Sequence, residues 1–163
     1  LSGSSDMTLG SAAQTAGIST VVVGSGATSV NASSLTNGLT VDLSAALASS
    51  QATGGSGADT IIGSSSVDTV LGDTLTGGAG ADQFVLGAKI TTITDFDATS
   101  DILNLRNFGG TAGDYSFNGI GGEGYTDQLF RNDTLGGSTL VANINVVGGS
   151  SSDILTSGHA LFA

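Results

Sequence analysis

The sequence contains no cysteine, no proline and no tryptophan among its 163 residues. Without cysteine the chain can form neither a disulfide framework nor a thiolate metal site. Without proline every residue keeps a backbone N–H, which suits a chain built from ladders of backbone hydrogen bonds. No apolar run is long enough to span a bilayer and no signal peptide pattern opens the chain, so we expect no insertion into a membrane.

Basic residues are almost missing as well. The chain has 3 basic residues, Lys89, Arg106 and Arg131, against 14 acidic ones, and its net charge is −11. All the acidic residues except Glu123 are Asp, which favours short carboxylates in turns over helical surfaces. Nucleic acids and anionic membrane surfaces are bound by basic patches, so we expect neither as a partner.

The side chains that assemble catalytic sites are equally scarce. His159 is the single histidine, and neither a His-Glu-x-x-His nor a Gly-x-Ser-x-Gly motif is present. The sequence therefore offers no nucleophile with a base and an orienting group, and we predict that the chain is not an enzyme. The acidic residues outside the motifs described next are predicted to be surface charges: Asp6, Asp42, Asp114, Glu123, Asp127 and Asp133.

What the sequence does contain is an internal repeat. Residues 54–62 (GGSGADTII) and 77–85 (GGAGADQFV) are two copies of one nine-residue pattern. Residues 63–71 keep its first Gly, its Asp and its apolar position, and residues 72–76 form a shortened copy. In each copy an apolar residue follows the Asp by two positions: Asp59 and Ile61, Asp68 and Val70, Asp73 and Leu75, Asp82 and Phe84. A fixed period predicts stacked identical units.

The residue types explain what one unit does. Glycine allows left-handed backbone angles, so the chain can turn tightly and direct its carbonyl groups into the turn. Carbonyl and carboxylate oxygens from successive turns then supply the oxygen ligands that calcium prefers. The alternative is a glycine-rich turn series without metal, but stacked carboxylates would repel one another without a cation. Each unit is thus a turn plus a short strand, and two units make one coil of a flattened parallel β-solenoid.

These repeats resemble the hemolysin-type calcium-binding repeats of RTX proteins. The resemblance implies an all-β fold, a parallel β-roll with calcium-binding Gly/Asp turns, and calcium as the cofactor. Residues 93–105 (ITDFDATSDILNL) resemble the segment that follows such repeats, and they add Asp95 and Asp101 as ligands of a last site, with less weight on Asp97; the alternative there is a solvated acidic loop. The predicted metal ligands are Gly54, Ser56, Gly57, Asp59, Gly63, Asp68, Asp73, Gly77, Ala79, Gly80, Asp82, Asp95 and Asp101.

The chain divides into four predicted parts. Residues 1–17 are a lead-in segment, residues 18–53 are solenoid rungs without calcium motifs, residues 54–105 are the calcium-binding β-roll, and residues 106–163 are a β-rich cap. In the second part Val21, Val30 and Leu39 lie nine residues apart, and residues 44–52 are the one plausible helical turn, although the segment is short enough to be a loop. All eight aromatic residues lie from Phe84 onward, which predicts a more ordinary packed core in the cap. A hairpin is expected around residues 134–137.

The predicted function follows from charge and calcium. At low calcium the Asp rows repel and the glycine-rich turns cost too much entropy, so the repeats stay unfolded; extracellular calcium triggers folding. The C-terminal residues resemble the uncleaved signal of type I secretion, which implies type I machinery as a partner and a secreted or bacterial cell-surface location. Residues 30–44 resemble the solenoids of S-layer proteins, which favours a self-associating S-layer, matrix or fibre subunit. Two alternatives remain: the export module of a larger secreted enzyme, and an adhesin.

Overall fold

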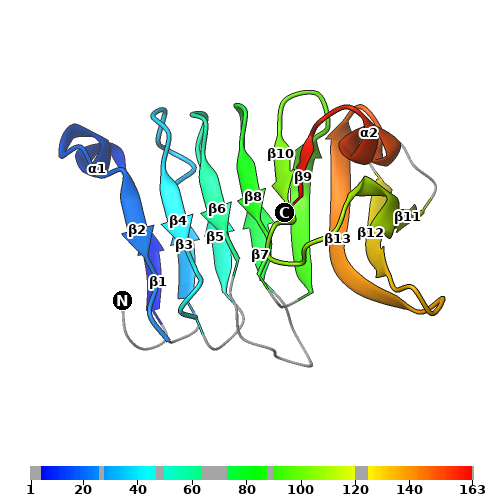
Figure 1. Cartoon of the computed structure of the whole chain (residues 1–163). Coiled ribbons are helices and arrows are strands. Elements are labelled where there is room, and N and C mark those ends of the chain that lie inside the picture. Colours follow the sequence, from blue (N-terminus) through cyan, green and yellow to red (C-terminus); the bar gives the residue numbers. More distant parts are fainter. Residues whose placement is uncertain are drawn as a thin grey trace.

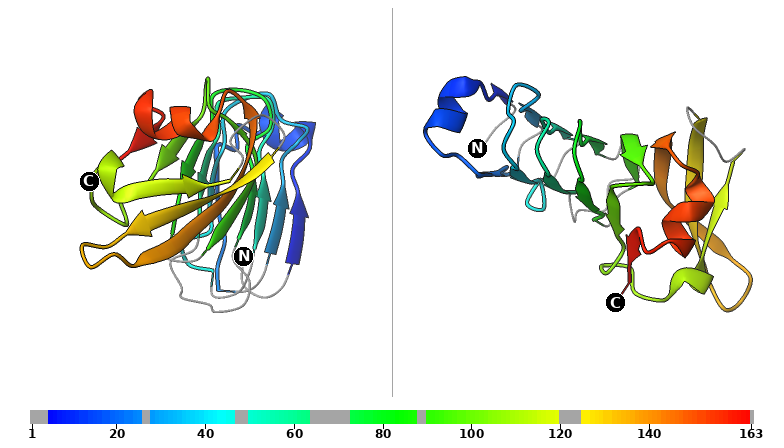
Figure 2. Two further views of the ribbon diagram at one scale, coloured as in Figure 1. Left: turned by 90° about the vertical axis from the view of Figure 1, so that its right-hand side faces the viewer. Right: turned by 90° about the horizontal axis from the view of Figure 1, so that it is seen from above.

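The computed structural model describes residues 5–25, 28–46, 50–63, 73–87, 90–119 and 125–162. In these residues the chain winds into a β-solenoid whose strands form two sheets, one of eight strands and one of six (Figure 1). The solenoid has a helical turn at one end and a cap at the other (Figure 2). The predicted all-β, parallel solenoid fold is confirmed.

Successive strands alternate between the two sheets, so each coil gives one strand to each sheet. Neighbouring strands of the coils are parallel, from β1 and β2 to β9 and β10. The first sheet has the order β1 (Ser5–Thr8), β3 (Thr28–Asn31), β5 (Gln51–Thr53), β7 (Thr74–Thr76), β9 (Thr91–Asp97), β13 (Ser138–Gly148), β12 (Tyr125–Asn132) and β11 (Tyr115–Asn118). The second has the order β14 (Ala160–Leu161), β10 (Ile102–Asn104), β8 (Gln83–Val85), β6 (Thr60–Ile62), β4 (Thr40–Asp42) and β2 (Thr20–Val22).

Most coil strands are only three residues long, and their central side chain points inward. Because side chains alternate between the faces of a strand, a triplet buries its middle residue, as Ile61, Leu75 and Phe84 show with no exposed surface. In register, Ile61 lies between Val41 and Phe84. The apolar position of the repeat is therefore the core position of each rung.

Two segments differ from the predictions. The lead-in prediction for residues 1–17 is wrong from Ser5 onward, because β1 pairs with β3, with Met7 opposite Val30, and α1 (Ser11–Thr15) occupies the turn that follows. The helical turn predicted at 44–52 is also wrong, since residues 44–45 form a turn and β5 begins at Gln51. Both segments are small and polar, and the backbone of a neighbouring rung decides their structure, which local propensity does not reveal.

The C-terminal part closes the solenoid with an antiparallel extension of the first sheet. The predicted hairpin is confirmed: β12 and β13 are antiparallel partners, and β11 follows on the outer side of β12. A 3₁₀ turn, η1 (Ala112–Asp114), precedes β11, and α2 (Ser151–Thr156) follows β13. Residues 160–161 then return to the second sheet as β14, beside β10. No helix in the described part of the chain is long and apolar enough to cross a membrane.

Aromatic side chains join the roll to its cap. The rings of Phe84 and Phe96, both fully buried, have centroids 5.9 Å apart and a tilted geometry. Tyr115 and Phe162 form a second tilted pair, with centroids 5.5 Å apart. Such pairs stabilise a core beyond the area they bury.

Replacing Phe84 by Ala should lower the free energy of unfolding by about 3–5 kcal/mol, because it leaves a cavity and removes the ring contact with Phe96. Leu135 provides the control, since its side chain is 96% exposed and Leu135→Ala should change stability by less than about 0.5 kcal/mol. Denaturant unfolding of both variants at saturating calcium measures the difference. Equal stability of the two variants would contradict the assignment of Phe84 to the core.

Candidate metal centre

The turns that lead from the first sheet to the second carry a row of carboxylates. Asp59, Asp82 and Asp101 each lie directly before a strand of the second sheet, and all three are buried. Asp73 lies directly before β7, a strand of the first sheet, and is therefore on the opposite edge of the roll. Among the described Asp residues of the repeats, Asp59 and Asp82 therefore share one edge and Asp73 lies on the other.

In the row, each carboxylate binds the coil before it. Asp59 Oδ1 accepts the backbone N–H of Leu39 at 2.7 Å, Asp82 Oδ1 accepts that of Asp59 at 2.8 Å, and Asp101 Oδ1 accepts that of Asp82 at 2.9 Å. One oxygen of each Asp thus replaces a backbone acceptor between neighbouring coils. These hydrogen bonds hold the turns of neighbouring coils in register.

The second oxygens of the row are not equivalent. Asp59 Oδ2 accepts the N–H of Gly55 at 2.7 Å, and Asp101 Oδ2 accepts the N–H of Asp97 at 2.9 Å, in each case from four residues earlier. The corresponding donor in the middle turn is Gly78, but its N–H donates to Asp95 Oδ2 at 2.8 Å. Asp82 Oδ2 is consequently buried with no hydrogen-bond partner.

The cause is a bulge in β9. One residue of β13 separates Ile144 from Val146, whereas two residues of β9, Thr94 and Asp95, separate their partners Ile93 and Phe96, so β9 holds an extra residue there. Bulges redirect side chains. Here the carbonyl of Thr94 accepts Asn145 Nδ2 at 2.8 Å, and Asp95 Oδ1 accepts the N–H of Gly77 at 2.9 Å.

The preceding coil, which lies away from the bulge, shows which acceptors the glycine N–H groups of a regular turn have. There the N–H of Gly54 donates to the carbonyl of Thr76 at 2.8 Å, as an ordinary backbone ladder requires. At the bulge the Asp95 carboxylate receives both N–H groups, of Gly77 and Gly78, that a carbonyl and the turn's own Asp would otherwise receive. The bulge thereby leaves one carboxylate oxygen of Asp82 available for another ligand.

Two glycines bring the stacked turns into close contact. Gly78 has φ +100° and Gly80 has φ +131°, values that favour glycine. A Cβ atom on Gly78 would collide with the carbonyl oxygen of Gly55, and one on Gly80 with the carbonyl oxygen of Gly57. Carbonyl groups of the first turn therefore point at the backbone of the second turn, next to the carboxylate row.

Burial and neighbouring negative charges disfavour the ionised form of Asp82. Burial, which removes water from the carboxylate, and the neighbouring charges of Asp101, Asp59 and Asp95 together raise its pKa to about 7, against the lowering effect of the hydrogen bond from the Asp59 N–H. Burial also raises the pKa of Asp101. The hydroxyl of Thr99, which donates to Asp97 Oδ1 at 2.6 Å, lowers the pKa of Asp97.

These groups fit a calcium ion. A buried carboxylate oxygen without a donor, a neighbouring carboxylate and the backbone carbonyl groups of the stacked turns are all hard oxygen ligands. Within the described residues, no three acidic or histidine side chains are grouped closely enough to hold a metal by themselves. The ligand set would therefore combine one or two Asp side chains with backbone carbonyl oxygens.

The predicted ligands fall into three places. The turn from β5 to β6 holds Gly54, Ser56, Gly57 and Asp59, and the turn from β7 to β8 stacks on it with Gly77, Ala79, Gly80 and Asp82. Asp95 and Asp101 come from β9 and the next turn of the same row. Gly63 and Asp73 lie together on the opposite edge, where a Cβ on Gly63 would be 3.5 Å from Asp73 Oδ2. Asp68 lies outside the described residues.

The sequence alone does not predict the places of Gly55, Gly78 and Asp127. Gly55 and Gly78, the second glycine of each full repeat, supply the N–H groups that distinguish the two turns, and their strict repetition was a usable signal. Asp127 was predicted to be a surface charge, which is wrong: it has no exposed surface. It lies two residues before Leu129 on β12 and shares that strand's inward face, an orientation set by pairing with β13.

Without calcium, stability should fall as the pH rises from about 4 to about 7. The folded state binds the Asp82 proton more tightly than the unfolded chain does, so its contribution is fully present at low pH and is lost as Asp82 ionises. The difference should be on the order of a few kcal/mol. The fraction of calcium-stripped protein that has β-structure, followed by far-UV circular dichroism at pH 5 and pH 8, measures it, and that fraction should be larger at pH 5. Asp82→Asn should flatten the dependence; an unchanged slope would contradict it.

Substituting Gly78 by Ala should prevent the turns from stacking. Positive φ alone costs about 1–2 kcal/mol, and the collision with the Gly55 carbonyl about 1–3 kcal/mol more. Gly136 is the matched control, because it has φ +85° but no atom within 4 Å of an added Cβ. Gly78→Ala should therefore destabilise the protein more than Gly136→Ala and require more calcium to fold. Equal effects on both properties would refute close stacking.

Comparison with known proteins agrees with this geometry. A family model of four copies of the RTX calcium-binding nonapeptide repeat matches residues 51–74 and again residues 72–88. Searches of curated proteins and of solved structures found no match. The matched residues contain both stacked glycine turns, β5 to β8, and the row positions Asp59 and Asp82. Residues 51–88 therefore match the RTX calcium-binding nonapeptide repeat.

Proposed function

We propose that the chain is a structural module of a secreted bacterial cell-surface protein, which folds and self-associates on meeting extracellular calcium. The observation that carries this proposal is the buried, unpartnered Oδ2 atom of Asp82 between two further carboxylates of its row. The repeats contain no basic residue between positions 54 and 85 that could balance these charges. A cation is the remaining source of compensation.

Folding would be coupled to calcium through the turns. The chain must fix glycine-rich turns at high entropic cost and bring buried carboxylates together, and both effects oppose the calcium-free folded state. Calcium, when bound, supplies positive charge to the carboxylate row. Asp82, Asp95 and the turn carbonyl groups would hold it. A site of the affinity usual for extracellular modules contributes about 1–1.5 kcal/mol at millimolar calcium, so several coupled sites are needed.

Export would precede folding. Residues 160–161 pair with β10, and the backbone N–H groups of Leu103 and Leu105 donate to the carbonyls of His159 and Leu161. In the folded protein this C-terminal segment is thus a rung of the roll. Type I machinery that recognises the segment would have to engage it in the unfolded chain, which low cytosolic calcium maintains. In this function the chain has no catalytic role.

Self-association would use the end of the solenoid at β1 and β2. Both strands are the outermost members of their sheets in the part of the chain that the structure describes. Exposed apolar side chains on the outermost strands of a sheet are common sites of association between chains. On β2 Val22 is 57% exposed, and Ile18 just before it is 37% exposed. A second copy of the chain, packed on this end of the solenoid, would cover this apolar surface.

A calcium titration that records far-UV circular dichroism and light scattering on one sample tests both parts of the proposal. Calcium should induce β-structure, and scattering should rise with it. Asp82→Asn should raise the calcium concentration needed for half-maximal folding several-fold, whereas Asp6→Asn, which removes an exposed carboxylate on β1, should not. Val22→Lys should leave calcium-dependent folding intact and abolish the rise in scattering.

Other outcomes would separate the alternatives. Calcium-dependent β-structure without a rise in scattering would refute self-association and favour a folding and export module of a larger secreted protein. Structure that is indifferent to both calcium and chelator would refute the calcium proposal itself.

A further inference from the structure

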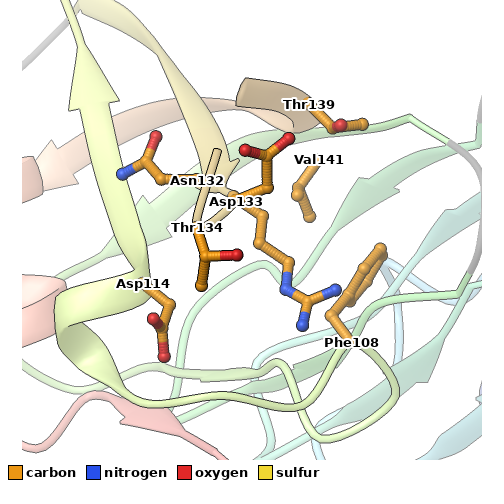
Figure 3. A pocket seen from close by; sticks show the side chains of 8 residues that line it. Phe108, Asp114, Asn132, Asp133, Thr134, Thr139 and Val141 are labelled. Carbon is orange, nitrogen blue, oxygen red and sulfur yellow. The ribbon is translucent and has the colours of Figure 1, made fainter. Parts of the chain in front are cut away.

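The cap contains a cavity that the calcium function does not use. Its volume is about 400 Å³, and it lies between η1, the end of β12 and the start of β13 (Figure 3). Phe108 and the buried Val141 form an apolar floor, while Asp114, Arg131, Asn132 and Asp133 contribute polar groups around it. The size is within the range of small-molecule sites.

The cavity continues the inward face of the cap sheet. Arg131 lies two residues after the buried Leu129 on β12, so both side chains leave the strand on the same face. Tyr115, which is opposite Arg131 on β11, is buried against Phe162. A bulge between Leu129 and Phe130 lets Val141 and Ala142 of β13 both be buried. The Arg131 guanidinium therefore extends from the same face of β12 that contributes Leu129 to the core.

The guanidinium of Arg131 has donors to spare. It forms no ion pair or hydrogen bond with any residue in the described ranges, although its charge contributes to the lowered pKa of Asp114, behind the hydrogen bonds from Thr111. Arg131 and Phe108 both line the cavity. Arginine carries five N–H donors and no acceptor, so this side of the cavity offers donors alone.

The facing carboxylates offer acceptors, and each is already fixed by the backbone. Asp114 Oδ2 accepts the N–H and the hydroxyl of Thr111 at 2.8 and 3.0 Å. Asp133 Oδ1 accepts the N–H groups of Leu135 and Gly137, both at 2.8 Å. These bonds orient the two carboxylates and leave further acceptor positions on them. One donor-only group and two acceptor-only groups therefore line the cavity, together with the amide of Asn132 and the hydroxyls of Thr134 and Thr139.

We propose that this cavity binds a neutral hexopyranose at the surface of the cap. Each sugar hydroxyl both donates and accepts a hydrogen bond, so it can bridge the Arg131 guanidinium and a carboxylate. The C–H face of the ring would lie on the apolar floor of Phe108 and Val141. Two carboxylates against one guanidinium, in a chain of net charge −11, disfavour an anionic sugar. The site makes the cap a recognition element, independent of the carboxylate row.

The test is a titration of the calcium-loaded chain with the methyl glycosides of D-glucose, D-galactose and D-mannose, followed by protein NMR. At least one glycoside should cause saturable shifts confined to Phe108, the end of β12 and the following turn. Arg131→Gln should weaken that binding about ten-fold or more, because it removes charged donors. Arg106→Gln is the matched control, since Arg106 is exposed and does not line the cavity.

Three results would overturn the proposal: no saturable shift with any of the three glycosides, equal losses in Arg131→Gln and Arg106→Gln, or tighter binding of D-glucuronate than of the neutral sugars. Each variant is first checked for an unchanged circular dichroism spectrum with calcium. Failure of sugar binding in a protein that still folds on calcium leaves the calcium function standing. Failure of calcium-induced folding in the parent chain is a separate result.

Discussion

The structure depends on one interaction, the hydrogen bond from a backbone N–H to the Asp carboxylate of the next coil. Asp59, Asp82 and Asp101 repeat it along one edge, at 2.7 to 2.9 Å. The row continues at Leu39 into a coil with no acidic turn, so the same geometry joins the repeats to the rungs before them. The same carboxylate groups fix the register of the coils and repel one another. The row therefore stabilises the roll and also makes it depend on compensation of its charge.

The bulge in β9 gives the row its asymmetry. By presenting Asp95 to Gly77 and Gly78, it releases Asp82 Oδ2 from the bond that Asp59 and Asp101 each retain within their own turns. A perfectly regular roll would satisfy every carboxylate internally. The bulge in β9 therefore makes Asp82 a candidate calcium ligand. The amide of Asn145, which is 51 residues after Thr94, donates to the Thr94 carbonyl and helps to stabilise the bulge.

Much of the geometry of the roll is predictable from the repeats, because their period indicates which residues form the turn, which residue is buried and which carries a charge. Asp59, Ile61, Asp82 and Phe84 lie where the period requires. The period could not reveal that Asp73 stands on the opposite edge, that residues 5–8 form a rung, or that Asp127 is buried. Those outcomes depend on strand pairing between distant segments. The cavity around Arg131 depends likewise on a bulge, and no local pattern announces it.

The place of β14 has a consequence for the order of folding. The ring of His159 and the carbonyl of Asp101, 2.8 Å apart, are separated by 58 residues of chain, and β14 supplies the outermost rung of the second sheet beside β10. Closing a loop of that length is slow compared with pairing neighbouring coils. The roll would therefore have an uncovered edge at Leu103 and Leu105 until residues 159–161 pair with it. Docking of the C-terminal segment would complete the fold after the coils have formed.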